Sequence, residues 1–158
     1  MATSDTSPAD GRGPVRRYLI VANQTLGGEH LARAIRERLA RGPCRFHVVV
    51  PATPPAGRFT WTEEGAHRQA EERLGTAVDR LRILGAAADG EVGDANPVAA
   101  VGDVLRSEEP FDEIILSTLP PGRSRWLKAD LPRRLRAITS VEVTHVAAAA
   151  EEPIPIQG

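Results

Sequence analysis

Short apolar runs alternate with amphipathic stretches along most of this chain. Runs rich in Val, Ile, Leu and aromatic residues, bounded by polar residues, glycine or proline, predict buried β-strands. The stretches between them repeat apolar residues every three or four positions, which is typical of helices with one buried face. The predicted strands are 18–22, 46–50, 87–92, 114–116 and 141–146, and the predicted helices are 25–41, 63–84, 97–105 and 130–138.

The longest of these patterns, residues 63–84, defines a helix by its apolar stripe and its end. Gly85 follows the pattern directly and predicts a C-terminal cap, because glycine adopts the left-handed backbone there without strain. The stripe itself consists of Ala70, Leu74, Ala77, Val78, Leu81 and Leu84.

The order of strands and helices predicts the fold class. Strands that alternate with helices form a parallel sheet with right-handed crossovers. Five strands in a chain of 158 residues favour an α/β fold of three layers, a doubly wound sheet of five parallel strands in the order 3-2-1-4-5. The predicted domain spans residues 16–149. Residues 1–15 predict a disordered arm, and residues 150–158 predict a flexible tail.

This strand order places a candidate ligand site between the first and fourth strands. The direction of winding reverses there, and ligands of open α/β sheets bind in the crevice at such a point, beyond the carboxyl ends of the strands. The segments 23–28 and 117–124 should form the walls of the crevice. The candidate ligand-binding residues are Ala22, Asn23, Thr25, Ser117, Thr118, Gly122, Arg123 and Ser124.

Positive charge is concentrated beside this crevice, although the chain carries a formal net charge of only -1. Such a small net charge gives no overall attraction to nucleic acid or membranes. Residues 122–136 carry six positive charges and one negative charge. This segment is suited to an anion, although charge runs of this kind also occur on solvated helix faces.

Composition narrows the class of protein further. Cys44 is the only cysteine, which excludes an internal disulfide and a cysteine-based zinc site. No apolar run approaches the ~18 residues of a membrane helix, and the N-terminus lacks the pattern of a signal peptide. We therefore expect a cytoplasmic protein that binds neither membranes nor nucleic acid.

The sequence contains no recognisable catalytic or metal-binding pattern. No Ser-His-Asp order and no nucleophile elbow is present, so no catalytic residue is predicted. The histidines, which show neither ligand spacing nor a paired carboxylate in the sequence, are His30, His47, His67 and His145. Trp126 either stacks on a bound base or makes a contact at the rim or in the core.

Five segments within residues 17–148 carry a further signal. They are Val21-Ala-Asn-Gln-Thr25, Gly93-Asp-Ala-Asn-Pro97, Phe111-Asp-Glu-Ile-Ile-Leu116, Gly122-Arg-Ser124 and Val143-Thr-His-Val146. Together and in this order they resemble the universal stress protein family, a branch of the adenine-nucleotide-binding α/β folds. The resemblance implies ATP or another nucleotide as a ligand. It also implies a homodimer formed through the last strand, Val141–Val146.

The nucleotide motif of that family is only partly present. ATP-binding members carry Gly-x-x-Gly, nine residues, then Gly-Ser or Gly-Thr, and these glycines let backbone amides approach the phosphates. Gly122 matches the second glycine, but Leu119 and Pro132 stand where the others would be. Asn23 replaces the family's strand-1 aspartate, and Asp130 is expected to cap the helix that follows. We therefore predict that ATP binds weakly or not at all.

Three functional hypotheses follow. The first is a non-catalytic, universal-stress-like regulatory domain that binds a ligand or anion and signals through an unknown protein partner. The second is a dimerising interaction module whose crevice is filled by Leu119, Pro120, Pro121 and Trp126. The third is an enzyme that acts on a nucleotide or phosphorylated substrate. Against the homodimer, a monomer results if residues 147–150 and the proline-containing tail fold back over the last strand.

Overall fold

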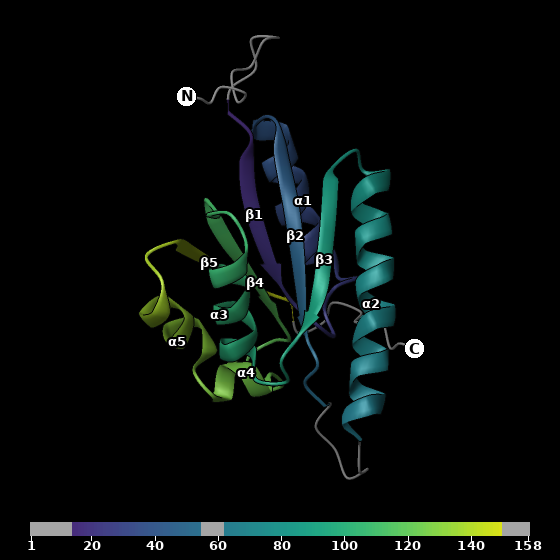
Figure 1. The fold of residues 1–158 in the computed structure, drawn as a ribbon, viewed down its shortest axis with the longest axis vertical. Coiled ribbons are helices and arrows are strands. Elements are labelled where there is room, and N and C mark those ends of the chain that lie inside the picture. The colour runs from purple at the N-terminus through teal and green to yellow at the C-terminus, as the bar shows by residue number, and fades with distance from the viewer. Residues whose placement is uncertain (1–13, 55–61, 150–158) are drawn as a thin grey trace.

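The protein forms an α/β fold in which helices cover both faces of one parallel sheet (Figure 1). The computed structural model describes residues 14–54 and 62–149. The sheet has five strands in the order β3-β2-β1-β4-β5, so the predicted fold class and strand order are confirmed. Apart from residues 14 and 15, the predicted N-terminal arm and the C-terminal tail lie outside the described residues.

All five predicted strands are present, but the bounds of each differ from the predicted bounds by one residue or more. The strands are β1 (Arg16–Val21), β2 (Cys44–Pro51), β3 (Ala87–Gly93), β4 (Glu113–Thr118) and β5 (Glu142–Ala147). The helices are α1 (Glu29–Arg41), α2 (Glu63–Ile83), α3 (Pro97–Ser107), α4 (Arg125–Lys128) and α5 (Leu131–Ile138). None of these described helices is long and apolar enough to cross a membrane.

The core lies in two layers, one on each face of the sheet. Alternate side chains of a strand point to opposite faces, so the central strands β1 and β4 supply both layers. On one face Ile20 and Ile115 pack against α1 and α2, and on the other Leu19 and Ile114 pack against α3 and α5. Every residue of β4 is buried. Such burial is expected for a parallel strand that has neighbours on both edges and helices on both faces.

The pairing of β1 with β4 fixes the position of the crevice. Their register places Val21 beside Leu116, so both strands end at nearly the same level of the sheet. Beyond this level Ala22 to Gly28 leave the sheet, whereas Ser117 and Thr118 continue β4 beside β5 before the chain turns away. In Figure 1, α4 lies at this end, toward which the strand arrows point.

The structure corrects three details of the sequence prediction. Leu84 does not belong to the buried stripe: α2 ends at Ile83, Gly85 turns the chain with a φ of 95°, and Leu84 is 44% exposed. The short helix α4 was not predicted, because four residues are too few to show helical periodicity.

The third correction concerns Asp130, which does not cap α5 through its side chain. Its backbone is left-handed, with φ 60° and ψ 41°, whereas a capping residue has extended backbone that aims its oxygen at the next amides. The Asp130 carboxylate instead accepts a hydrogen bond from Arg133 Nε at 2.7 Å. The amides at the start of α5 are therefore not satisfied by this side chain, contrary to the expectation.

Candidate functional site

A pocket of about 310 Å³ lies at the carboxyl ends of β1 and β4. Four parts of the chain meet there: the β1–α1 loop, the segment after β2, helix α2, and the segment from the end of β4 into α4. The lining residues are Asn23, Gln24, Thr25, Thr53, Pro54, Arg73, Ser117, Thr118, Leu119, Arg123, Ser124, Arg125 and Trp126. Pockets of this size, at this point of an α/β sheet, are typical of sites for small ligands.

On the β1 side, the Asn23 side chain links three elements. Its Nδ2 donates to the Pro51 carbonyl at 2.8 Å, and its Oδ1 accepts from Arg73 Nη1. Asn23 is 8% exposed, so both amide atoms are satisfied inside the protein. The end of β2 therefore orients the amide, and the amide in turn holds the α2 guanidinium at the pocket.

Arg73 is only half-exposed, which affects its charge in one direction. Burial lowers the pKa of its guanidinium below the ordinary value, because desolvation disfavours the charged form. A guanidinium nevertheless stays protonated at neutral pH. Arg73 is therefore a positive charge that is held in a partly desolvated position, where its attraction for an anion is screened less than at the surface.

On the β4 side, Ser117 joins the end of the strand to the start of α1. Its hydroxyl lies 2.5 Å from Thr25 Oγ1 and 2.8 Å from His30 Nε2. All three residues are at most 7% exposed. This buried network fixes the spacing of the two crevice walls, and it leaves Ser117 only 1% exposed.

Thr118 forms a second anchor, to the neighbouring strand β5. Its hydroxyl donates to the Leu119 carbonyl at 2.9 Å and lies 2.8 Å from His145 Nε2. Burial, followed by the charges of Arg136 and His30, lowers the pKa of His145 below 6.5. The lowered pKa favours the neutral ring, which can donate from Nε2 to the Thr118 hydroxyl while that hydroxyl donates to Leu119.

The loop after β4 forms the floor of the pocket. Gly122 turns it with a φ of 90°, and the Arg123 amide donates to the Pro120 carbonyl at 3.0 Å. Ser124 caps α4, since its hydroxyl accepts from the Leu127 amide at 3.1 Å. Arg125 Nη1 donates to the Pro54 carbonyl at 2.6 Å and so ties this loop to the segment after β2.

The electrostatics of the pocket favour anions. Arg73, Arg123 and Arg125 line it, and the described lining residues include no aspartate or glutamate. Arg73 comes from α2, whereas Arg123 and Arg125 come from the segment that leads from β4 into α4, so two parts of the lining supply the positive charge. Arginine also presents several donors in a planar fork, which matches phosphate and carboxylate groups.

Most of the predicted site residues lie together at this pocket. Asn23, Thr25, Ser117, Thr118, Arg123 and Ser124 all line it. Two predicted residues do not. Ala22 is fully buried in the core beside α1, and Gly122 contributes the turn of the loop without lining the space.

Other residues of the site were missed or misjudged from the sequence. Arg73 was not predicted, although its spacing of three from Ala70 and four from Ala77 places it beside the buried stripe of α2. His30 was not predicted to belong to the site, but its Nε2 lies 2.8 Å from Ser117 Oγ. Leu119 and Trp126, which the second hypothesis places inside the crevice, are among the residues that line the pocket.

Comparisons with known proteins add no assignment. No protein-family model matches this chain, and a search of curated proteins finds no match.

Proposed function

We propose that this protein is a non-catalytic binding domain that takes a small anionic ligand, with phosphate as the recognised group, in the pocket between β1 and β4. The observation that carries the proposal is a set of three arginines, one from α2 and two from the segment after β4, around a pocket whose described lining has no carboxylate. The pocket has a volume of about 310 Å³. A concave space of this size suits a phosphorylated metabolite or a mononucleotide better than it suits the flat surface of a protein partner.

The arrangement of Ser117 favours binding over catalysis. A nucleophilic serine needs access to its substrate as well as a neighbouring base. His30 is within reach of Ser117, but the hydroxyl is 1% exposed and is also held by Thr25. We therefore assign Ser117 to positioning the crevice walls.

The proposal keeps the expected relation to the universal stress proteins and their regulatory role. In this reading, ligand occupancy of the crevice is signalled to a protein partner. The crevice residues Asn23, Thr25, Ser117 and Thr118 stand where the resemblance places a nucleotide. A cytoplasmic location belongs to the same proposal and rests on the sequence argument that Cys44 is the single cysteine.

Titration calorimetry of the purified chain with inorganic phosphate, AMP and ATP tests the proposal. We expect AMP or phosphate to bind, and Arg73→Met to weaken this binding by about 10–100-fold, because a hydrogen bond to a charged group contributes ~1.5–3 kcal/mol. The double variant Arg123→Ala, Ser124→Ala should weaken binding in the same way.

Arg133→Ala is the matched control for that experiment. Arg133 belongs to the same basic segment, but its side chain is 82% exposed, pairs with Asp130 and does not line the pocket. Binding should be unchanged in this variant. If the control weakens binding as much as the pocket variants, the charge of the whole segment is responsible and the pocket is not the site.

ATP should bind more weakly than the smaller ligands. Two of the three phosphate-binding glycines of the family pattern are missing, so backbone amides cannot approach a triphosphate as that pattern allows. Asp130 does not cap α5 through its side chain, but its negative charge lies at the start of that helix. Micromolar or tighter ATP binding in calorimetry would contradict this prediction.

A further inference from the structure

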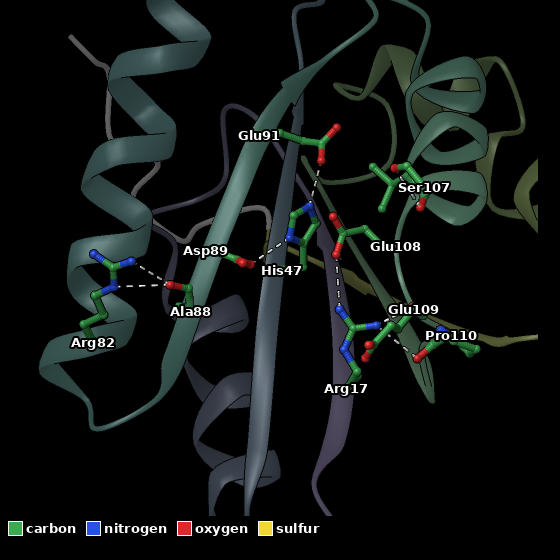
Figure 2. Close-up of polar contacts among 11 residues, drawn as sticks. Arg17, His47, Arg82, Ala88, Asp89, Glu91, Ser107, Glu108, Glu109 and Pro110 are labelled. Atoms are coloured by element: carbon green, nitrogen blue, oxygen red, sulfur yellow. Dashed lines mark hydrogen bonds and ion pairs between the residues drawn. The ribbon is translucent and has the colours of Figure 1, made fainter. Parts of the chain in front are cut away.

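A second polar cluster lies away from the pocket, on the face of the sheet that carries α3. His47 projects from the middle of β2 on the same face as Val49, and Asp89 and Glu91 project from the adjacent strand β3. Glu108, the C-cap residue that directly follows α3, extends its side chain to the same place. Figure 2 shows the imidazole between the two β3 carboxylates, with Glu108 directed toward it.

No histidine was predicted to have a paired carboxylate, and for His47 this prediction is wrong. Its Nδ1 lies 2.7 Å from Asp89 Oδ1, and its Nε2 lies 3.0 Å from Glu91 Oε1. Ligand atoms of His47, Glu91 and Glu108 all lie within 4.8 Å of one another. The pairs are separated by more than 40 positions in sequence and become neighbours only through the register of β2 and β3.

Burial differs among these residues in a way that suits an ion-binding site. The His47 side chain is 6% exposed, so its ring is held in place by the surrounding core, including Phe111. The Glu91 and Glu108 side chains are 40% and 30% exposed, so an ion can reach their oxygens from solvent. A rigid, buried ligand beside two accessible ones is a partly formed coordination site.

Both ring nitrogens of His47 face a carboxylate oxygen. In the tautomer whose Nδ1–H donates to Asp89, the lone pair of Nε2 points toward Glu91 Oε1 at 3.0 Å, where a cation could be shared between them. Histidine ligands of metals usually donate their other ring N–H to a carboxylate in this way, which fixes the tautomer and the ring orientation.

The charge of the cluster also favours a divalent cation. Asp89, Glu91 and Glu108 bring three carboxylates to one place. Arg17 from β1 offsets part of this charge, since its Nη2 lies 3.3 Å from Glu108 Oε1. Arg17 also donates to the carbonyls of Glu109 and Pro110, so it holds the segment that carries Glu108 against the sheet (Figure 2).

We propose that His47, Glu91 and Glu108 bind a divalent transition-metal ion of the Zn²⁺ type, with Asp89 positioning the imidazole. An ion shared at ~2.0–2.2 Å brings its ligand atoms to about 3–4 Å of one another, and rotation of the two accessible glutamates closes the cluster to that spacing. One nitrogen with two oxygens suits Zn²⁺ and Mn²⁺, whereas Mg²⁺ prefers oxygen ligands alone. The ion joins β2, β3 and the end of α3.

The test is calorimetric titration of the full chain with Zn²⁺ in a buffer free of phosphate. We expect one ion per chain, and a loss of affinity of at least tenfold in His47→Ala, Glu91→Gln and Glu108→Gln. Asp89→Asn should lose about 10–100-fold, as outer-sphere carboxylates do. Mg²⁺ should bind more weakly than Zn²⁺.

His67→Ala is the matched control, because His67 is an exposed histidine whose Nδ1 lies 3.6 Å from Glu71 on α2. This variant should bind Zn²⁺ like the unmodified protein. Unchanged binding in Glu108→Gln, loss of binding in His67→Ala, or no saturable binding at all would each overturn the proposal.

A thermal measurement keeps the test decisive if His47→Ala fails to fold. A ligand that binds only the folded state at ~100 times its Kd should raise the Tm of a chain of this size by about 5–10 °C. Zn²⁺ should produce this rise in the unmodified protein and in His67→Ala. A rise of equal size in folded Glu91→Gln or Glu108→Gln would exclude this cluster as the site.

Discussion

At the scale of single residues, one buried ion pair connects α1 to the sheet. Arg38 of α1 makes two hydrogen bonds to the Glu113 carboxylate of β4, at 2.6 and 3.2 Å, and both side chains are 6% exposed. Thr144 of β5 donates to the same carboxylate. Removing one partner of such a pair leaves an uncompensated buried charge, whereas removing both does not.

We therefore expect Arg38→Met to destabilise the protein by ~3–5 kcal/mol. The double variant Arg38→Met, Glu113→Leu should recover most of this loss, because an apolar pair of similar volume fits the same space. Urea denaturation of both variants measures the two free energies of unfolding. A double variant as unstable as the single one would show that the pair contributes more than charge compensation.

The same pair predicts a pH dependence of stability. Burial alone would raise the pKa of Glu113, but hydrogen bonds from Arg38 and Thr144 and the Arg38 charge outweigh it and hold the pKa below the ordinary value of 4.5. The folded state thus favours the ionised carboxylate. Its contribution to stability is complete above pH 4.5 and is lost as the pH falls below that value toward the folded pKa.

The Glu113→Gln variant has no ionisable carboxylate at this position, so its stability provides the comparison for the pH dependence. The unmodified protein should be more stable than this variant at pH 7, and the difference should shrink as the pH falls from 5 to 3. Urea midpoints at several pH values measure the difference. A gap that stays constant across this range would mean that Glu113 does not titrate as the structure implies.

At the scale of elements, the contact of α2 with the sheet depends on a glycine in β3. A Cβ at Gly90 would lie 2.4 Å from the Val48 carbonyl oxygen and 2.6 Å from Leu74 Cδ1. The backbone oxygen belongs to a paired neighbouring strand and has little freedom to move. The small residue therefore sets how closely the strands and the helix approach.

Gly90→Ala should destabilise the protein by about 1–3 kcal/mol, the usual cost of overpacking. Gly75→Ala, on α2 itself, is the matched substitution, because a Cβ there meets nothing within 4 Å. It should stabilise by ~0.5–1 kcal/mol, since alanine is the better helix former. Thermal unfolding of both variants tests the pair, and equal effects in the same direction would contradict the packing argument.

At the scale of the whole molecule, β5 is one edge of the sheet. The proposed monomer alternative had residues 147–150 fold back over this edge. Ala147 instead remains paired with Thr118, and the Ala148 amide donates to the Thr118 carbonyl at 3.1 Å. The described part of that run therefore continues along β4. Arg136 Nη2 donates to the Val143 carbonyl at 3.0 Å, and this bond occupies one acceptor of the strand.

We predict a homodimer in which β5 pairs antiparallel with its copy about a two-fold axis, because a β-prone edge strand favours such pairing. Sedimentation at micromolar concentration should show a dimer. Val143→Pro should weaken it, and Arg136→Ala should leave it intact or strengthen it by freeing the Val143 carbonyl. A clean monomer of 17.0 kDa, or a dimer unaffected by Val143→Pro, would show that β5 is not the interface.

Only part of the candidate site could be predicted, and particular residues show why. Asn23, Ser117 and Thr118 were found because they directly follow strands whose apolar runs mark the carboxyl edge of the sheet. Arg73 lies 50 positions from Asn23, and its approach depends on how α2 is rotated on the sheet. Asp130 was misjudged because a left-handed backbone is set by the turn between α4 and α5, which leaves no clear sequence signal.

The sequence by itself determined the elements other than α4, the parallel sheet, the strand order and the end of the sheet where the pocket lies. These follow from local apolar periodicity and from the chirality of crossovers, which each segment carries in its own residues. Only the tertiary structure decided which side chains meet: Arg73 with Asn23, His30 with Ser117, and His47 with Glu91 and Glu108. Such contacts depend on strand register and helix rotation, because both are set by packing across the whole core and not by neighbours in sequence.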